Sequence, residues 1–174
     1  YGIDVRLPGM LYATILRAPV NGERALKVED AEAKKVPGVK QIVSLPYGVA
    51  VVAETYPAAL KGRKALKVEW SQASKARSYT TDKVIPEYQQ RVRNLADKGT
   101  IYEAHGDARA AIDQSAKKVA AEFYWPVQSH ASLGPSCAVA DVRDGKATVW
   151  SPSQATHRFR ETISRALALP KDAV

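Results

Sequence analysis

Polar residues gather near the end of this 174-residue chain, where a predicted strand gives way to a predicted helix. The strand KATVW ends at Trp150, and Ser-Pro-Ser-Gln leads into a helical pattern from about 155 to 167. Because the first N–H groups of a helix lack partners within it, such junctions favour polar or anionic ligands. The side-chain amide of Gln154 can donate and accept hydrogen bonds, which suits it to an oxo group or a phosphate. Gln154 is therefore the candidate ligand-binding residue.

A purely structural interpretation of the same junction is also open. Ser151 or Ser153 would cap the helix, and Gln154 would simply face solvent. His130 poses a similar question, because it lies in the small-residue loop SHASLGPS, where a hydrogen-bonded structural role competes with a catalytic one. The residues alone decide neither question, and no catalytic residue is predicted.

Metal and nucleotide chemistry within this chain is disfavoured by residue counts and spacing. The single cysteine, Cys137, permits no internal disulfide, and its apolar setting CAVADV predicts a buried, inert thiol. The three histidines show no metal-binding spacing, so no metal ligand is predicted. Neither GxGxxG nor GxxxxGK[ST] occurs, which argues against the common nucleotide-binding loops.

The charge and hydropathy of the chain narrow its possible partners. A net charge of +8, from 26 Lys and Arg against 18 Asp and Glu, raises the possibility of nucleic-acid binding. The basic residues are spread along the chain without interleaved aromatic residues, which favours a solvated basic surface and no nucleic-acid partner. No apolar run approaches the roughly 20 residues that a membrane helix needs, so no membrane span is expected.

Short strands and helices alternate through the first 70 residues, with Pro-Gly and Asn-Gly turns between them. The expected strands are 11–16, 25–29, 39–45, 48–53 and 66–70, and the expected helices are 31–35 and 57–65. This order of elements, β-β-α-β-β-α-β, indicates an α+β module.

The remainder of the chain divides at a polar stretch. Residues 71–100 contain few large aliphatic side chains and are predicted to form a linker with a surface helix near 86–96. From 101 to 174 we expect a helix that starts after Asp107, two strands around an Asp144-Gly145 turn, and the final amphipathic helix. A further strand is predicted at 117–125.

Two sets of segments resemble known domains in the right order along the chain. YGIDVRLPGMLYATILRAP, VPGVKQIV and GVAVVAETYPAALKGRKALKVEW resemble the hammerhead domain of the xanthine dehydrogenase/aldehyde oxidase family of molybdenum enzymes. The stretch from GDARAAIDQSA to the C-terminus resembles the start of that family's molybdopterin-binding domain. The resemblance implies an α+β fold, with a hammerhead module at 1–70, a linker at 71–100, and the first βαββα portion of a molybdenum-cofactor-binding domain at 101–174.

This family resemblance assigns a role to the junction. In the family, the Gln of a Trp-x-x-x-Gln junction approaches the molybdenum centre, which places Gln154 against the cofactor with Trp150 as its anchor. The loop His130-Ala-Ser-Leu-Gly134-Pro lacks the acidic residue found before the proline in many members. In this respect it resembles the nicotinate dehydrogenase and isoquinoline oxidoreductase branch.

The resemblance also implies a function for the complete protein. We expect a molybdenum hydroxylase large subunit that carries a molybdopterin-type cofactor and hydroxylates an aldehyde or N-heteroaromatic substrate with oxygen from water. Its partners would be the rest of the large subunit and an iron–sulfur subunit or domain, in the bacterial cytoplasm or periplasm as a soluble protein. The catalytic base lies outside this sequence, so the isolated chain is expected to be inactive and free of cofactor. The alternative is a non-catalytic module for subunit docking or assembly.

Overall fold

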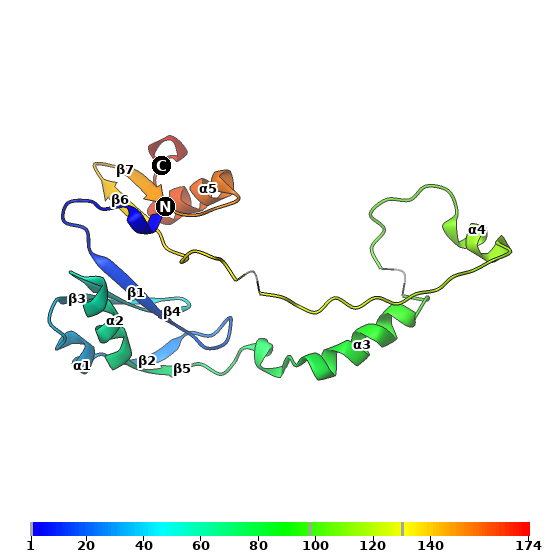
Figure 1. Ribbon diagram of the computed structural model, residues 1–174, viewed down its shortest axis with the longest axis horizontal. Coiled ribbons are helices and arrows are strands. Elements are labelled where there is room, and N and C mark those ends of the chain that lie inside the picture. Colours follow the sequence, from blue (N-terminus) through cyan, green and yellow to red (C-terminus); the bar gives the residue numbers. More distant parts are fainter. Residues whose placement is uncertain (1, 98, 130) are drawn as a thin grey trace. The chain divides into compact units, whose positions relative to one another are not determined.

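The computed structural model describes residues 2–97, 99–129 and 131–174, and the chain falls into two compact units. One unit comprises Met10–Ala120, and the other combines Tyr1–Gly9 with Ala121–Val174. Figure 1 shows the elements of both. The predicted boundaries at 70 and 100 stay a prediction.

An antiparallel sheet with strand order β1-β4-β3 forms the centre of the first unit. Its strands are β1 (Tyr12–Arg17), β3 (Val39–Leu45) and β4 (Gly48–Ala53). The central strand β4 has the sequence GVAVVA and is buried at all but one position, as its continuous apolar run predicts. In β1, Thr14 is buried, and its hydroxyl donates to the backbone oxygen of Ala59 at 3.0 Å.

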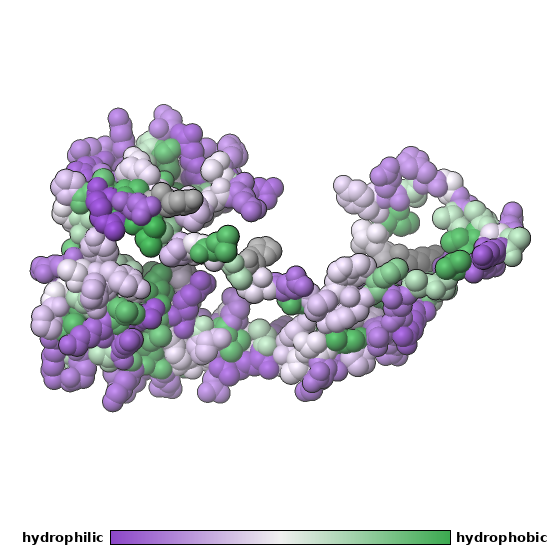
Figure 2. All heavy atoms as spheres, viewed as in Figure 1, coloured by the Kyte–Doolittle hydropathy of each residue, from purple (hydrophilic) through white to green (hydrophobic). Residues whose placement is uncertain are grey.

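Two helices and a two-stranded antiparallel ribbon accompany this sheet, and we call these elements together, from β1 to β5, the sheet body. They are α1 (Ala31–Lys34), α2 (Tyr56–Ala65) and the antiparallel pair β2 (Ala25–Glu29) and β5 (Lys67–Trp70). Helix α2 packs on β1 and β4, as Figure 1 shows, and Thr55 caps its first turn. The core comprises Ala33, Val49, Val51 and Leu66, and hydrophilic residues lie around its periphery in Figure 2.

Residues 71–120 carry only local structure. A 3-10 helix, η2 (Lys75–Ser78), precedes α3 (Thr81–Arg93), and α4 (Ala108–Gln114) follows. The linker helix therefore begins five residues earlier than predicted, because Pro86 lies inside the helix instead of at its first turn. The predicted N-cap Asp107 is confirmed, and its carboxylate accepts from the N–H of Ala110 at 2.9 Å.

The second unit contains a β-hairpin and an amphipathic helix. Its elements are η1 (Gly2–Asp4), β6 (Val139–Arg143), β7 (Lys146–Trp150), α5 (Thr156–Leu167) and η3 (Lys171–Ala173). Asp144 and Gly145 both have positive φ at the hairpin turn, as the Asp-Gly dipeptide predicts. The hairpin, its turn and the helix thus lie where the sequence placed them.

The predicted strand at 117–125 is wrong. These residues form no ladder in the described part of the chain, and Val119, Phe123 and Trp125 are 72–85% exposed. A strand requires a neighbouring backbone for its N–H and C=O groups, and alternation of side chains alone does not supply one. In place of the predicted βαββα portion, residues 101–174 therefore show the order α4, β6, β7, α5. The mixed helix and sheet class is confirmed.

Candidate functional site

The candidate site is the junction between β7 and α5. Trp150 ends β7, where it pairs with Val139 of β6 and is half-buried. The backbone of Gly2 lies against this position, since a Cβ added to Gly2 would be 3.2 Å from the Trp150 carbonyl oxygen. Gly2 was not singled out from the sequence, because nothing local to an N-terminal glycine reports a contact almost 150 residues away. The C-terminal end of β7 thus has β6 on one side and the backbone of Gly2 against it.

Neither serine of the junction caps α5. The hydroxyl of Ser151 donates to the backbone oxygen of Cys137 at 3.3 Å and so ties the junction to the chain before β6. The hydroxyl of Ser153 accepts from the N–H of Ala155 at 3.1 Å. Ala155 itself is the N-cap of α5 and has no side chain that could accept a hydrogen bond from the first turn. The interpretation in which a serine caps the helix is therefore wrong.

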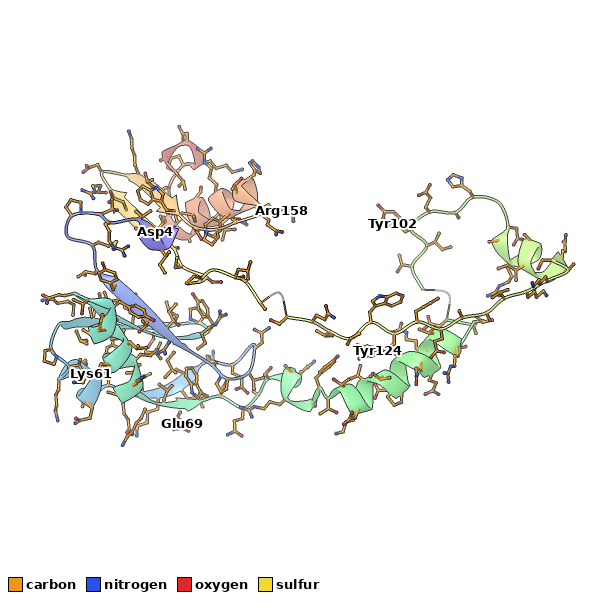
Figure 3. The ribbon with its side chains drawn as sticks, viewed as in Figure 1. Asp4, Lys61, Glu69, Tyr102, Tyr124 and Arg158 are labelled. Carbon is orange, nitrogen blue, oxygen red and sulfur yellow. The ribbon has the colours of Figure 1, made fainter. Side chains whose placement is uncertain are left out.

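Gln154 lies at the bend immediately before α5 and is exposed. Its side chain makes no hydrogen bond to any residue that the structure describes. The first turn of α5 contains no acidic residue, and it carries Arg158, labelled in Figure 3. A neutral amide, uncapped helix N–H groups and a guanidinium are all hydrogen-bond donors, and they share one end of the helix. These residues fit a group that bears oxo or phosphate oxygens.

The opposite end of α5 is held by its own contacts. Ala168 takes the left-handed conformation that ends the helix, and the hydroxyl of Ser164 donates to the Leu169 backbone oxygen at 2.6 Å. Lys171 of η3 returns to form an ion pair with Glu161. The hydrogen bond from Lys171 lowers the pKa of the Glu161 carboxyl, with smaller contributions from the charges of neighbouring cations. These contacts hold the C-terminal end of α5 and η3 together.

The other residues considered from the sequence add no metal or nucleophilic centre. Cys137 is a free, half-buried thiol, in place of the fully buried one expected. The Nε2 of His105 lies 2.8 Å from a carboxylate oxygen of Glu103, and the Nε2 of His157 lies 3.7 Å from one of Glu161; both histidines are exposed. Among the residues that the structure describes, no cluster of His, Cys, Asp and Glu could hold a metal ion. His130 lies outside the described residues.

Two of the surface cavities formed by the described residues lie within Met10–Ala120, away from Gln154 in the sequence. One, of about 610 Å³, lies beside the end of α3, and it is lined by Arg91, Val92, Leu95, Asp97, Ile101 and Arg109 among others. The other, of about 340 Å³, is lined by Arg17, Asn21, Glu23 and Tyr47 with their neighbours. The guanidinium of Arg17 lies 5.3 Å from the centre of the Tyr47 ring, so both residues are already engaged in a cation–π contact.

Comparison with known proteins gives this junction its context. Residues 89–174 match the molybdopterin cofactor-binding domain family. The chain is 31% identical to a nicotinate dehydrogenase subunit of Pseudomonas putida over 97% of its length. It is also 31% identical to the beta subunit of isoquinoline 1-oxidoreductase from Brevundimonas diminuta over 88% of its length. The chain belongs to the xanthine dehydrogenase/aldehyde oxidase family of molybdenum enzymes. The predicted likeness to the nicotinate and isoquinoline branch is confirmed, as is a molybdopterin-type cofactor for the full-length enzyme.

The fold agrees with this membership. Quinoline 2-oxidoreductase from Pseudomonas putida 86 aligns with a TM-score of 0.67 over 99% of this chain and 27% of its own, at 17% identity. The chain spans 14% of the nicotinate dehydrogenase subunit and 20% of the isoquinoline oxidoreductase subunit. In the part of the chain that the structure describes, no helix has the length and apolar character needed to cross a membrane.

Proposed function

We propose that this chain is part of the cofactor-binding subunit of a molybdenum hydroxylase that acts on an N-heteroaromatic or aldehyde substrate. The relatives that support this proposal are named for nicotinate and isoquinoline, both N-heteroaromatic compounds. Within it, residues 1–70 correspond to the hammerhead domain and residues 101–174 to the beginning of the molybdopterin-binding domain. When bound, the cofactor would supply the redox chemistry that adds oxygen from water to the substrate. An iron–sulfur subunit or domain would carry the electrons away.

Gln154 is the residue of this chain proposed to contact the cofactor. The observation that carries this assignment is the exposed amide of Gln154 beside a helix start that no side chain caps. Its Nε2 would donate a hydrogen bond to an oxo group and thereby orient the cofactor without adding charge. The N–H groups of the first turn of α5 and the guanidinium of Arg158 would favour negative oxygen atoms nearby. No residue of this chain is assigned as the catalytic base, so the chain alone would be inactive.

The test is Gln154→Ala in the complete enzyme, assayed for molybdenum content and for turnover of an N-heteroaromatic substrate such as nicotinate. Losing one positioned donor is expected to lower turnover about tenfold or more, with smaller loss of bound molybdenum. Gln154→Glu should be at least as damaging, because a carboxylate repels oxo and phosphate oxygens. The matched control is Gln114→Ala, which removes an exposed glutamine at the end of α4 and should leave both quantities unchanged.

Two outcomes would contradict the proposal in different ways. Unchanged turnover and molybdenum content in Gln154→Ala would mean that Gln154 is only a residue at the start of a helix. A complete wild-type protein that purifies without molybdenum after expression with the cofactor machinery would instead favour the non-catalytic docking or assembly module.

A further inference from the structure

Glu23 is the largest buried charged residue of the sheet body. It lies in the turn at 20–24, between β1 and β2, and only 1% of its surface is exposed. Carboxylates are almost never buried to this degree unless a cation pairs with them, because removal from water penalises the charge. Its partner is Arg77, which lies 54 residues later in η2. The Nε of Arg77 donates to one carboxylate oxygen, and Nη2 donates to the other at 2.8 Å.

Further hydrogen bonds join the same two segments. The N–H of Ser71 donates to the Arg24 backbone oxygen at 2.9 Å, and the N–H of Arg24 donates to the Ser71 hydroxyl at 3.1 Å. The hydroxyl of Ser74 donates to the Asn21 backbone oxygen at 2.6 Å. These bonds continue the β2–β5 ribbon beyond Trp70, where the sequence indicated the start of a linker. Residues 71–78 are therefore attached to the turn at several points.

We propose that residues 71–78 are a strap, latched to the turn at 20–24 by the Glu23–Arg77 ion pair, that fixes where the connecting segment leaves the sheet body. A guanidinium suits this task better than an ammonium, because its planar fork engages both carboxylate oxygens and so fixes a direction as well as a distance. The neighbouring Lys75 is exposed and forms no ion pair with the residues that the structure describes. The specificity of the contact thus rests on one of the two cations of η2.

Removing one partner of the Glu23–Arg77 ion pair is expected to cost more stability than replacing both. Replacing both partners of a buried ion pair is often tolerated, whereas removing one partner leaves an uncompensated charge that the chain must expose to water. Arg77 is partly exposed, at 40%, while the carboxylate of Glu23 is fully enclosed. Loss of Arg77 should therefore detach the strap, because its two hydrogen bonds to Glu23 are gone and the unpaired carboxylate favours an open segment.

The experiment compares Arg77→Ala with wild type in the full 174-residue chain. Chymotrypsin cleavage after Tyr79, which directly follows η2, reports detachment of the strap. Cleavage after Tyr102, which is 99% exposed, provides an internal reference in the same digest. We expect cleavage after Tyr79 to be about tenfold faster or more, because local opening then exposes the site. Lys75→Ala, in the same 3-10 helix, should cleave at the wild-type rate.

Amide hydrogen exchange in β4 separates release of the strap from unfolding of the sheet body. If Arg77→Ala also loses protection in β4, the double variant Glu23→Gln/Arg77→Ala removes the buried charge and should restore that protection while Tyr79 stays readily cleaved. Arg77→Lys should give an intermediate cleavage rate, because a single ammonium nitrogen replaces the two guanidinium nitrogens that engage separate carboxylate oxygens. Cleavage after Tyr79 at the wild-type rate in Arg77→Ala, or in the double variant with β4 protected, would overturn the proposal.

Discussion

The sheet body and the second unit of this chain, which contains β6, β7 and α5, differ in how they use apolar residues. In the sheet body, β4 is buried at five of its six positions and packs between β1 and β3 beneath α2. In the hairpin β6–β7, by contrast, only Ala147 is buried, and Val142 is 51% exposed. In the sheet body, the strands find their hydrogen-bonding partners and the core side chains find their packing partners within the same region. The second unit presents a polar junction backed by little packing.

This difference bears on where a binding site can form. Exposed donors such as those at Gln154 and the start of α5 remain available only where they are not satisfied by the fold itself. The body has few such groups, because its polar atoms are engaged: Thr14 bonds to Ala59, and Glu23 bonds to Arg77. In the second unit, the side chain of Gln154 is exposed and no side chain caps α5, so these donors are left accessible, as the proposed role requires.

The comparison is tested most strongly by truncating one valine in each region. Val51 is fully buried in β4, so Val51→Ala should lower the free energy of unfolding of the sheet body by about 2 kcal/mol through lost burial and the cavity left behind. Val142→Ala in β6 should change the local stability by less than about 0.5 kcal/mol. Amide hydrogen exchange in β4 and in β7 measures both values in the same protein. Equal losses would mean that the two regions are packed alike.

The same contrast explains which predictions from sequence succeeded. The strands at 25–29, 39–45 and 48–53 have the predicted bounds, because each is closed by a turn and completed by partners within the chain. The predicted strand at 117–125 carries Val119, Phe123 and Trp125 at odd-numbered positions, and the rings of Phe123 and Trp125 lie 5.6 Å apart. It lacks a pairing backbone in the described structure. Alternation of side chains indicates which face of a segment is apolar, but it does not indicate whether another strand lies beside it to form backbone hydrogen bonds.

The candidate site was predictable only in part. The position of Gln154 before α5 followed from the sequence, because the strand pattern ends at Trp150 and the helical pattern begins at about 155. That neither serine caps the helix did not follow, since Ser151 instead bonds to Cys137, 14 residues earlier. The Glu23–Arg77 pair was equally hidden, because 54 residues separate its members and no local pattern links them. Side-chain partners across such separations emerge only from the folded arrangement.

Overpacking tests the comparison in the opposite direction. A Cβ added to Gly62 of α2 would lie 2.8 Å from Cγ1 of Val51 and 3.0 Å from Cγ2 of Val39, both side chains of the packed sheet. Gly62→Ala should therefore destabilise the sheet body by about 1–2 kcal/mol, despite the better helix propensity of alanine. Gly134, in the other region, has nothing within 4 Å of the same added atom, so Gly134→Ala should be neutral. Urea titration followed by amide exchange in β4 for Gly62→Ala and in β7 for Gly134→Ala distinguishes the two, and a stabilised Gly62→Ala would show that the core has spare volume.

The smallest expected effect concerns the ion pair that anchors the end of α5. The hydrogen bond from Lys171 holds the pKa of Glu161 below its ordinary value of 4.5, so folding favours the ionised carboxylate. The stabilisation is therefore present above pH 4.5 and is lost as the pH falls through the lowered pKa of the folded state. An NMR titration of the Glu161 carboxyl should place its midpoint below 4.5, and Lys171→Ala should move it upward. Lys146→Ala, which removes an exposed lysine from β7, should leave the midpoint in place. Because both partners are accessible to water, amide exchange in η3 should change only slightly, in keeping with a region held by surface contacts.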